Sequence, residues 1–115
     1  MDAAHDVPSY LAAGSRRWLQ HLLDEYEFSP SEWRLAILAA ECFDRAATAR
    51  RLLSREGLTI TSPRGEQKSH PAVVIARDAA ALYSKLVAQL GLDQDPDDED
   101  EPQMRDSLGR RKPKR

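Results

Sequence analysis

Apolar residues recur at helical spacing in three stretches of the chain. Between residues 16 and 26 they follow the i, i+3, i+4 spacing of one buried face, at Trp18, Leu19, Leu22, Leu23 and Tyr26. Ser15 precedes this run and belongs to the residue types preferred at helix N-caps. The pattern predicts a short amphipathic helix that starts at Ser15.

A second, longer helix is bounded by clear start and stop signals. Ser29 and Glu32 have the spacing of a capping box, with Pro30 at the first helical position. Gly57 is typical of the left-handed residue that closes a helix. No Gly or Pro interrupts the 26 residues between Pro30 and Gly57, so we expect one continuous helix.

This long helix carries two apolar stripes. The first consists of Leu35, Leu38, Ala39, Cys42, Ala46, Ala49 and Leu53, and the second of Trp33, Ala36, Ile37, Ala40, Phe43 and Ala47. A helix that is apolar over so much of its circumference must be covered on two sides, and a chain of 115 residues has few elements to do so. We therefore expect a neighbouring subunit to contact the residues of an oligomer interface, namely Trp33, Ile37, Ala40, Phe43 and Ala47.

The period changes after Gly57. Leu-Thr-Ile-Thr and Glu-Gln-Lys-Ser flank a Ser-Pro-Arg-Gly turn, so residues 58–70 predict a short β-hairpin. Pro71 then opens a third helix with one apolar face, which Gly91 closes. The expected fold is all-α: a long antiparallel helical hairpin, a short N-terminal helix packed across it and a small β-hairpin at its far end. Burial within or between protomers is expected for Trp18, Leu22, Trp33, Ile37, Phe43, Leu82 and Leu86.

Charge is distributed unevenly along the chain. Residues 1–92 carry 11 acidic and 11 basic side chains, residues 93–101 carry seven acids and no base, and residues 102–115 carry six bases and one acid. The last stretch has too few apolar residues to offset the entropy of ordering it. We expect a flexible N-terminal segment (1–14), a helical core (15–92) and a disordered, acidic then basic tail (93–115).

Several classes of protein are excluded by these patterns. Charged residues interrupt every apolar stretch, so none is long enough to span a membrane, and the acidic N-terminus lacks the apolar region of a secretory signal. We expect a cytoplasmic protein. The chain has no phosphate-binding glycine pattern, no G-x-S-x-G elbow and no H-E-x-x-H motif, and its three histidines are too scattered for a metal site. We expect no catalytic site, no cofactor and no metal.

Three groups that could carry chemistry are better interpreted as structural. Cys42 falls on an apolar stripe, where a buried and inert thiol is the ordinary outcome. His70 precedes Pro71 and favours a turn or capping role. Asp44 and Glu41 are placed to form exposed ion pairs with Arg45, which are worth only ~0.3–0.5 kcal/mol.

Basic residues are the remaining candidates for function, as contacts to phosphate. Arg16 and Arg17 lie in the first turn of the first helix, where positive charge opposes the helix dipole by ~0.3–1 kcal/mol. We expect an anion to compensate them: a phosphate, Asp24 or Glu25, or a neighbouring subunit.

Other basic residues divide by position. Arg64 lies with Lys68 on the projecting β-hairpin, where such charges reach a groove or simply aid solubility. Arg50, Arg51 and Arg55 suit the C-terminal end of a helix dipole and are interpreted as structural. The tail ends in a cluster that neutralises phosphates without sequence preference, or docks on an acidic protein: Arg110, Arg111, Lys112, Lys114 and Arg115.

The order of these pieces resembles a known family. A Trp-containing helix is followed by an S-P-S-E helix start, the stretch AAECFDRAATARRLL, the hairpin GLTITSPRGEQKSHP and a last helix that ends LVAQLGL. This order is similar to the small subunit of phage DNA-packaging terminases, specifically the P27-like branch, from about residue 16 to 92. The residues that carry the resemblance are Cys42, Asp44, Arg45, Gly57, Gly65, His70, Pro71, Leu90, Gly91 and Leu92. Relatives often follow L-G-L with a proline, whereas here an acidic run intervenes.

The resemblance implies a non-enzymatic subunit in the cytoplasm of an infected bacterium. Such a subunit assembles into a ring, recognises double-stranded viral DNA and presents it to the large subunit, which holds the ATPase and nuclease. The ring agrees with the two apolar stripes of the long helix, and it would multiply weak phosphate contacts. The expected DNA contacts are Arg16, Arg17, Arg34, Arg64, Lys68 and the terminal basic cluster, with the C-terminal segment also contacting the large subunit.

Two other functions remain open from the sequence. A small transcription regulator would use the first two helices as a helix-turn-helix, because the Glu27-Phe28-Ser29 link has about the right length. Its recognition helix would, however, start with an acidic and apolar stretch. A helical adaptor that ignores nucleic acid is the second alternative, since the core has no net charge.

Overall fold

Three helices and four short strands make up the described part of the chain. The computed structural model describes residues 5–93 and the backbone of Arg110 and Arg111. The helices are α1 (Ala13–Glu25), α2 (Pro30–Glu56) and α3 (Pro71–Gln89), and the strands are β1 (Tyr26–Glu27), β2 (Thr59–Thr61), β3 (Gln67–Ser69) and β4 (Arg110–Arg111).

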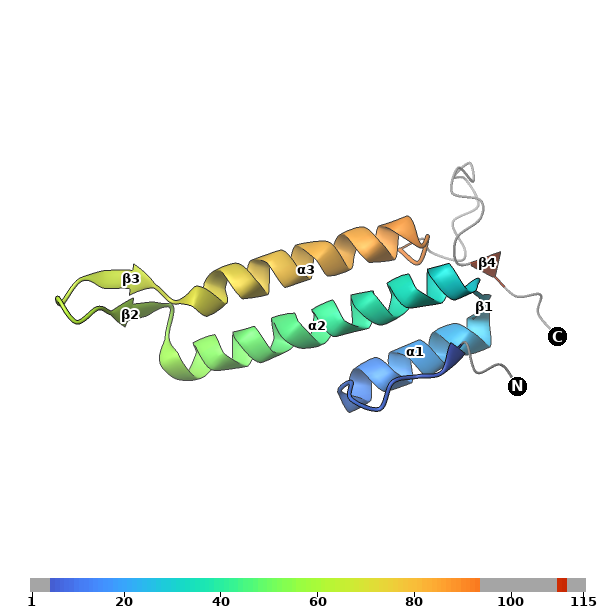
Figure 1. Ribbon diagram of the computed structural model, residues 1–115, viewed down its shortest axis with the longest axis horizontal. Helices are drawn as coiled ribbons and strands as arrows, with labels where there is room; N and C mark the ends of the chain where they lie inside the picture. The colour runs from blue at the N-terminus through green and yellow to red at the C-terminus, as the bar shows by residue number, and fades with distance from the viewer. Residues whose placement is uncertain (1–4, 94–109, 112–115) are drawn as a thin grey trace.

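The helices form an elongated body with α2 in the middle. Both α1 and α3 run antiparallel to α2, and the β2–β3 hairpin lies at the far end (Figure 1). The predicted helical hairpin, N-terminal helix and β-hairpin are confirmed, although α1 lies alongside the first half of α2 rather than across it. No described helix is long and apolar enough to cross a membrane.

Local signals account for both ends of α2. The Ser29 hydroxyl accepts a hydrogen bond from the backbone N–H of Glu32 at 3.1 Å, and the Glu32 carboxylate accepts one from the N–H of Ser29 at 2.7 Å. These two bonds satisfy N–H groups that have no partner within the helix. Gly57 ends the helix at φ 87°, in the region that favours glycine.

The start of α1 differs from the prediction. The helix begins at Ala13, with Ala12 as its N-cap, and Ser15 lies inside it as a buried residue. The Asp44 carboxylate of α2 accepts hydrogen bonds from the Ala12 N–H at 2.8 Å and the Ser15 hydroxyl at 2.6 Å. A side chain 32 residues away in the sequence therefore supplies the cap that we expected from Ser15.

Residues 5–12 pack on the helices, although we expected them to be part of a flexible segment. The Trp33 indole N–H donates to the Asp6 carbonyl at 3.1 Å, and Leu11 is buried in the core. The Tyr10 hydroxyl donates to the Glu41 carboxylate. Residues 1–4 of the same segment lie outside the described residues.

The tail contributes one described element. Arg110 and Arg111 pair antiparallel with Glu27 and Tyr26, which places β4 beside the α1–α2 connection. This strand pair was not predicted. The rest of the tail that we expected to be disordered, 94–109 and 112–115, lies outside the described residues.

The core lies between α1, the first half of α2 and the end of α3. Its largest fully buried side chains are Trp33, Leu19, Leu90 and Cys42. Of the side chains predicted to be buried, Leu22, Trp33 and Leu86 are buried, and Trp18 and Ile37 are partly buried. Phe43 and Leu82 remain 47% and 39% exposed in the protomer.

The second apolar stripe is divided between the core and the surface. Trp33 and Ala40 are buried by α1 and the N-terminal segment of their own chain, so they are not available to a neighbour. The sequence did not show that residues 5–12 would cover this part of the stripe, and the oligomer interface itself stays a prediction. Ile37 and Ala47 stay partly exposed and Phe43 exposed, with the Phe43 ring 5.3 Å from that of Tyr83.

Candidate nucleic-acid interface

The ends of the elongated molecule differ in charge. We call residues 44–78 the arm: the second half of α2, the β2–β3 hairpin and the start of α3, which project beyond α1 (Figure 1). We call residues 5–43 and 79–93 the head. The arm carries seven basic and four acidic side chains, whereas the head carries seven acidic and four basic ones. Folding thus turns a core with no net charge into a molecule with a basic end.

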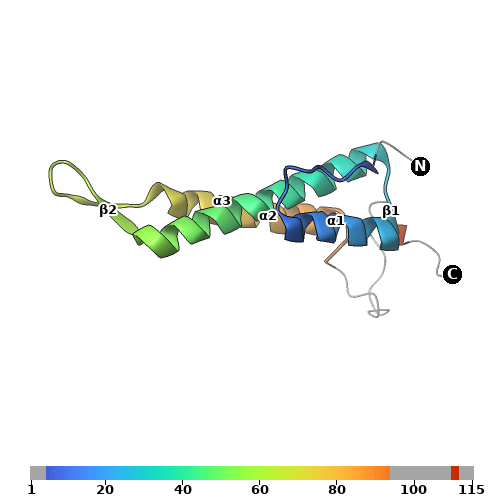
Figure 2. The ribbon, with the colours of Figure 1, turned by 90° about the horizontal axis from the view of Figure 1, so that it is seen from below.

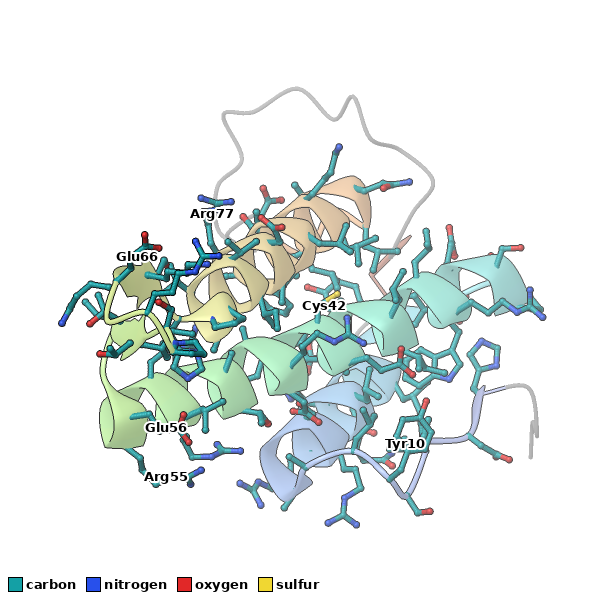
Figure 3. All side chains as sticks on the ribbon, turned by 60° about the vertical axis from the view of Figure 1, so that its left-hand side comes forward. Tyr10, Cys42, Arg55, Glu56, Glu66 and Arg77 are labelled. Carbon is teal, nitrogen blue, oxygen red and sulfur yellow. The ribbon has the colours of Figure 1, made fainter. Side chains whose placement is uncertain are left out.

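The basic side chains of the arm are open to solvent. Arg45, Arg50, Arg51 and Arg55 are all exposed on the part of α2 that α1 does not cover. Figure 3 shows Arg55 and Arg77 on opposite sides of the arm. Within residues 5–93, no carboxylate lies within ion-pair distance of the four α2 arginines.

Three of the four acids in the arm are already engaged. Asp44 caps α1, Glu56 contacts the His70 ring at 2.8 Å, and Asp78 pairs with Arg77 at 3.4 Å. The α2 arginines consequently keep their charge available for an external anion. These arginines are distributed around the exposed part of α2, and exposed, unneutralised arginines are the usual contacts to a phosphate backbone.

The predicted DNA contacts are brought together only in part. Arg64 and Lys68 are exposed on the hairpin, and Arg16 and Arg17 are exposed where α1 meets the base of the arm. Arg34 lies near the start of α2, in the acidic head and at the opposite end of a molecule 62 Å long. The side chains of Arg110 and Arg111, like Lys112, Lys114 and Arg115, lie outside the described residues.

The sequence interpretation missed the α2 arginines. Arg50, Arg51 and Arg55 were assigned to the helix dipole, and Arg45 to a pair with Asp44 or Glu41. In the structure Asp44 bonds to α1 and Glu41 accepts from Tyr10, so neither forms the expected ion pair. The signal in the sequence was four arginines against one acid, Glu56, within residues 45–56.

Asp44 also affects the charge balance at the first turn of α1, which contains Arg16 and Arg17. The first turn of α1 contains no acidic residue, so its dipole and its two arginines need a nearby anion. Asp44 brings a carboxylate from α2 to this turn, where it accepts from the Ala12 N–H and the Ser15 hydroxyl. Arg16 and Arg17 are both exposed, and Asp44 forms no ion pair with either of them among the described residues.

His70 holds the hairpin on the helices. Its Nδ1 accepts a hydrogen bond from the Ala72 N–H at 3.0 Å, and its Nε2 lies 2.8 Å from the Glu56 carboxylate. The neutral tautomer with a proton on Nε2 satisfies both contacts. His70 is buried, and its backbone N–H donates to Leu58, so one residue joins α2, the hairpin and α3. The predicted capping role is confirmed.

No arrangement of catalytic groups is visible in residues 5–93. Cys42 is buried between α2 and α3 (Figure 3), and burial raises the pKa of its thiol, with Arg45 opposing the shift and Glu41 adding to it. Within these residues no group of three His, Cys, Asp or Glu side chains is placed to hold a metal ion.

An open groove of about 600 Å³ lies at the base of the arm. It is lined by Tyr10, Asp44, Arg45 and Ile75 among others.

The geometry does not match a helix-turn-helix. In that motif two helices cross at roughly 90–120° and the second exposes its first turn to the major groove. Here α1 folds back alongside α2, and Glu32 in the first turn of α2 is buried in its capping box.

Comparison with known proteins identifies a family. A family model described as phage terminase, small subunit, matches residues 16–106, which include all three helices apart from the first turn of α1. No curated protein matches the chain. No solved structure matches it either.

Proposed function

The chain belongs to the phage terminase small subunit family, and from this membership we propose that it binds double-stranded viral DNA through its basic arm and presents that DNA to the terminase large subunit. The observation that carries the proposal is the group of exposed arginines on the second half of α2, with which no carboxylate in residues 5–93 forms an ion pair. The subunit itself performs no chemistry, and it acts in the cytoplasm of the infected bacterial host.

The proposed contacts extend along the length of the arm. Arg16 and Arg17 stand at its base, the α2 arginines along its length, and Arg64 and Lys68 at its tip. Each phosphate contact in water contributes little, but several together release counterions and give a strongly salt-dependent affinity. The acidic head is repelled by DNA, so the charge difference orients the subunit with its arm toward the duplex.

We expect the subunit to act as part of a closed ring. Phe43, Ile37 and Ala47 form a partly exposed apolar surface beside Tyr83 that a neighbouring subunit would cover. A ring places several arms on one duplex, which raises the effective concentration of the later contacts. Native mass spectrometry of the full-length protein should show one species of many 12.9 kDa protomers. A monomer at micromolar concentration would contradict the ring.

We assign the contact with the large subunit to the C-terminal tail, residues 93–115. Its terminal basic cluster, Arg110, Arg111, Lys112, Lys114 and Arg115, would also contact phosphate when DNA is bound. Membership of the P27-like branch fits the order of helix, hairpin and L-G-L ending.

Salt dependence of DNA binding tests the arm directly. Binding of a random-sequence duplex should be measured for the wild-type protein, for Arg50→Gln with Arg51→Gln, and for Arg16→Gln with Arg17→Gln. Each lost phosphate contact should flatten the slope of log affinity against log salt by about 0.9. Lys85→Gln is the matched control, because Lys85 is an exposed cation of the head.

Two results would contradict the proposal. Slopes that stay unchanged in both arginine pairs, or that change equally in Lys85→Gln, would show that the arm does not carry the phosphate contacts. Failure of the wild-type protein to bind any duplex at ~50 mM salt, where such contacts are strongest, would instead support a protein adaptor.

A further inference from the structure

The β2–β3 hairpin projects from the arm without support. It extends beyond the ends of α2 and α3 (Figures 1 and 2). All six residues of its two strands are exposed. A two-stranded sheet with no covering layer is marginally stable in water, so this hairpin gains stability from whatever it binds.

Its two faces carry different chemistry. The register pairs Thr59 with Ser69, Ile60 with Lys68, and Thr61 with Gln67. Because side chains alternate along a strand, one face holds only uncharged hydrogen-bonding groups. We call this the polar face, and it consists of Thr59, Thr61, Gln67 and Ser69. Ile60 and Lys68 occupy the opposite face.

Hydrogen bonds fix the two ends of the hairpin. At the tip, the Ser62 hydroxyl accepts from the backbone N–H groups of Arg64 and Glu66, and the Glu66 carbonyl accepts from the N–H of Ser62 at 2.7 Å. Gly65 takes a φ of 86° that closes this turn. At the base, His70 ties the second strand to α2 and α3. The bonds at the base set the direction in which the hairpin leaves the helices.

We propose that the polar face of the β2–β3 hairpin enters the major groove of double-stranded DNA and reads base edges there. This rests on the proposed function, since it assigns base recognition to one part of the surface that binds DNA. Two strands lie about 4.8 Å apart, and a major groove about 12 Å wide and about 8.5 Å deep admits such a ribbon. Gln pairs with adenine through two hydrogen bonds, and Ser and Thr hydroxyls donate to or accept from any base.

The surrounding charges suit this placement. Arg64 at the tip, Lys68 on the opposite face of the hairpin and Arg55 at the end of α2 are exposed cations that phosphate groups flanking the groove would contact. These contacts fix register but read no sequence, whereas the uncharged polar groups supply selectivity. In this arrangement the helix of the arm contacts phosphate groups, and the hairpin contacts base edges.

A protein partner fits this face less well. The centres of protein interfaces are rich in aromatic residues and depleted in serine. The polar face has no apolar side chain beyond the methyl groups of its threonines. Exposed apolar side chains do occur near the hairpin, but Ile60 lies on its opposite face. The other exposed apolar side chains include Leu58, Val74, Ile75, Phe43 and Leu82, none of which belongs to the polar face.

Selection from a pool of random-sequence duplexes tests the proposal with the full-length protein. Affinity is then measured for the selected duplex and for a scrambled duplex of the same composition, at one salt concentration. The variants are Thr59→Val with Thr61→Val, which keep the β-branched shape and remove the hydroxyls, and Gln67→Ala. Ile60→Val, on the opposite face, is the control.

The wild type should prefer the selected duplex, and the polar-face variants should lose between about fivefold and a hundredfold of that preference. Their affinity for the scrambled duplex and their salt slope should equal those of the wild type, as should every property of Ile60→Val. Circular dichroism and native mass confirm that the variants fold and assemble.

Three results would overturn the assignment. The wild type could bind duplexes without sequence preference, or the variants could keep its preference in full. The variants could instead lose the oligomeric state while keeping the preference, which would place the polar face against another subunit. In all three cases DNA binding by the arm would stand, whereas failure to bind any duplex would remove the proposed function as well.

Discussion

Replacing Asp44 tests how a single carboxylate joins α1 to the base of the arm. Asp44 accepts from the exposed Ala12 N–H and from the hydroxyl of Ser15, which is buried. In Asp44→Ala, water can reach Ala12, so that loss resembles the removal of a helix N-cap, about 1 kcal/mol. The Ser15 hydroxyl loses a charged partner in a buried site, which costs about 1–3 kcal/mol unless it turns to a carbonyl of its own helix.

We therefore expect Asp44→Ala to lower the free energy of unfolding by about 2 kcal/mol. Asp44→Asn keeps an acceptor but loses the charge that offsets the dipole of α1, so its cost should be smaller, about 1 kcal/mol. The two variants should also raise DNA affinity at low salt, because they remove a negative charge from the arm. Stability and DNA affinity are predicted to change in opposite directions.

Urea unfolding at one protein concentration measures the stability, because subunit association would otherwise shift the result. A double-mutant cycle with Ser15→Ala isolates the Ser15–Asp44 bond, for which we expect a coupling of about 1 kcal/mol. A change below about 0.5 kcal/mol in Asp44→Ala, or no coupling, would refute the cap between helices. Unchanged DNA affinity in a folded Asp44→Asn protein would count against the charged arm.

Two other residues give predictions of different kinds. His70→Ala leaves the Ala72 N–H without its acceptor and frees Glu56, so it should destabilise the protein by about 1–3 kcal/mol and speed amide exchange in the hairpin. His70→Asn keeps a capping oxygen and should recover part of that loss; equal losses would argue against the cap. Burial raises the pKa of Cys42 above its ordinary value of 9.0 and the pKa of Tyr83 above 10.0. As pH rises, the unfolded chain therefore loses these two protons before the folded protein does. The free energy of unfolding should consequently fall as pH rises above about 9. Urea unfolding from pH 7 to 10 measures this decline, which should be shallower in Cys42→Ala, and a flat wild-type profile would contradict it.

Elements whose ends depend on neighbouring residues were predictable from the sequence. The capping box at Ser29, the proline at position 71 and the glycines at 57 and 65 each act on their own turn, and the structure has α2, the hairpin and α3 where the pattern placed them. The start of α1 was not predictable in this way, because its cap comes from Asp44 through the fold. Residues 5–12 cover the apolar stripe around Trp33. The proline and polar residues of this segment show no helical or strand pattern, so the sequence did not predict this contact.

The type of residue in the candidate site was predictable from the sequence, but the position of the site on the fold was not. Basic residues were the expected contacts, and those on the hairpin and at the start of α1 were named from the sequence. Local reasoning assigned Arg50, Arg51 and Arg55 to the helix dipole, which is favourable for them in any fold. Only the arrangement of the helices shows that α1 begins beside Asp44 and does not cover the part of α2 that follows. Arg34 has the same chemistry but lies in the acidic head.

Hydrogen exchange with and without DNA is the most direct test that the arm carries the interaction. Full-length protein should be compared alone and with a random-sequence duplex at low salt, and amide protection followed along the chain. We predict that new protection falls within residues 44–78, strongest in the hairpin at 58–70, where the strands are exposed in the free protein. Protection confined to residues 5–43 or 79–93, with none in the arm, would contradict the account.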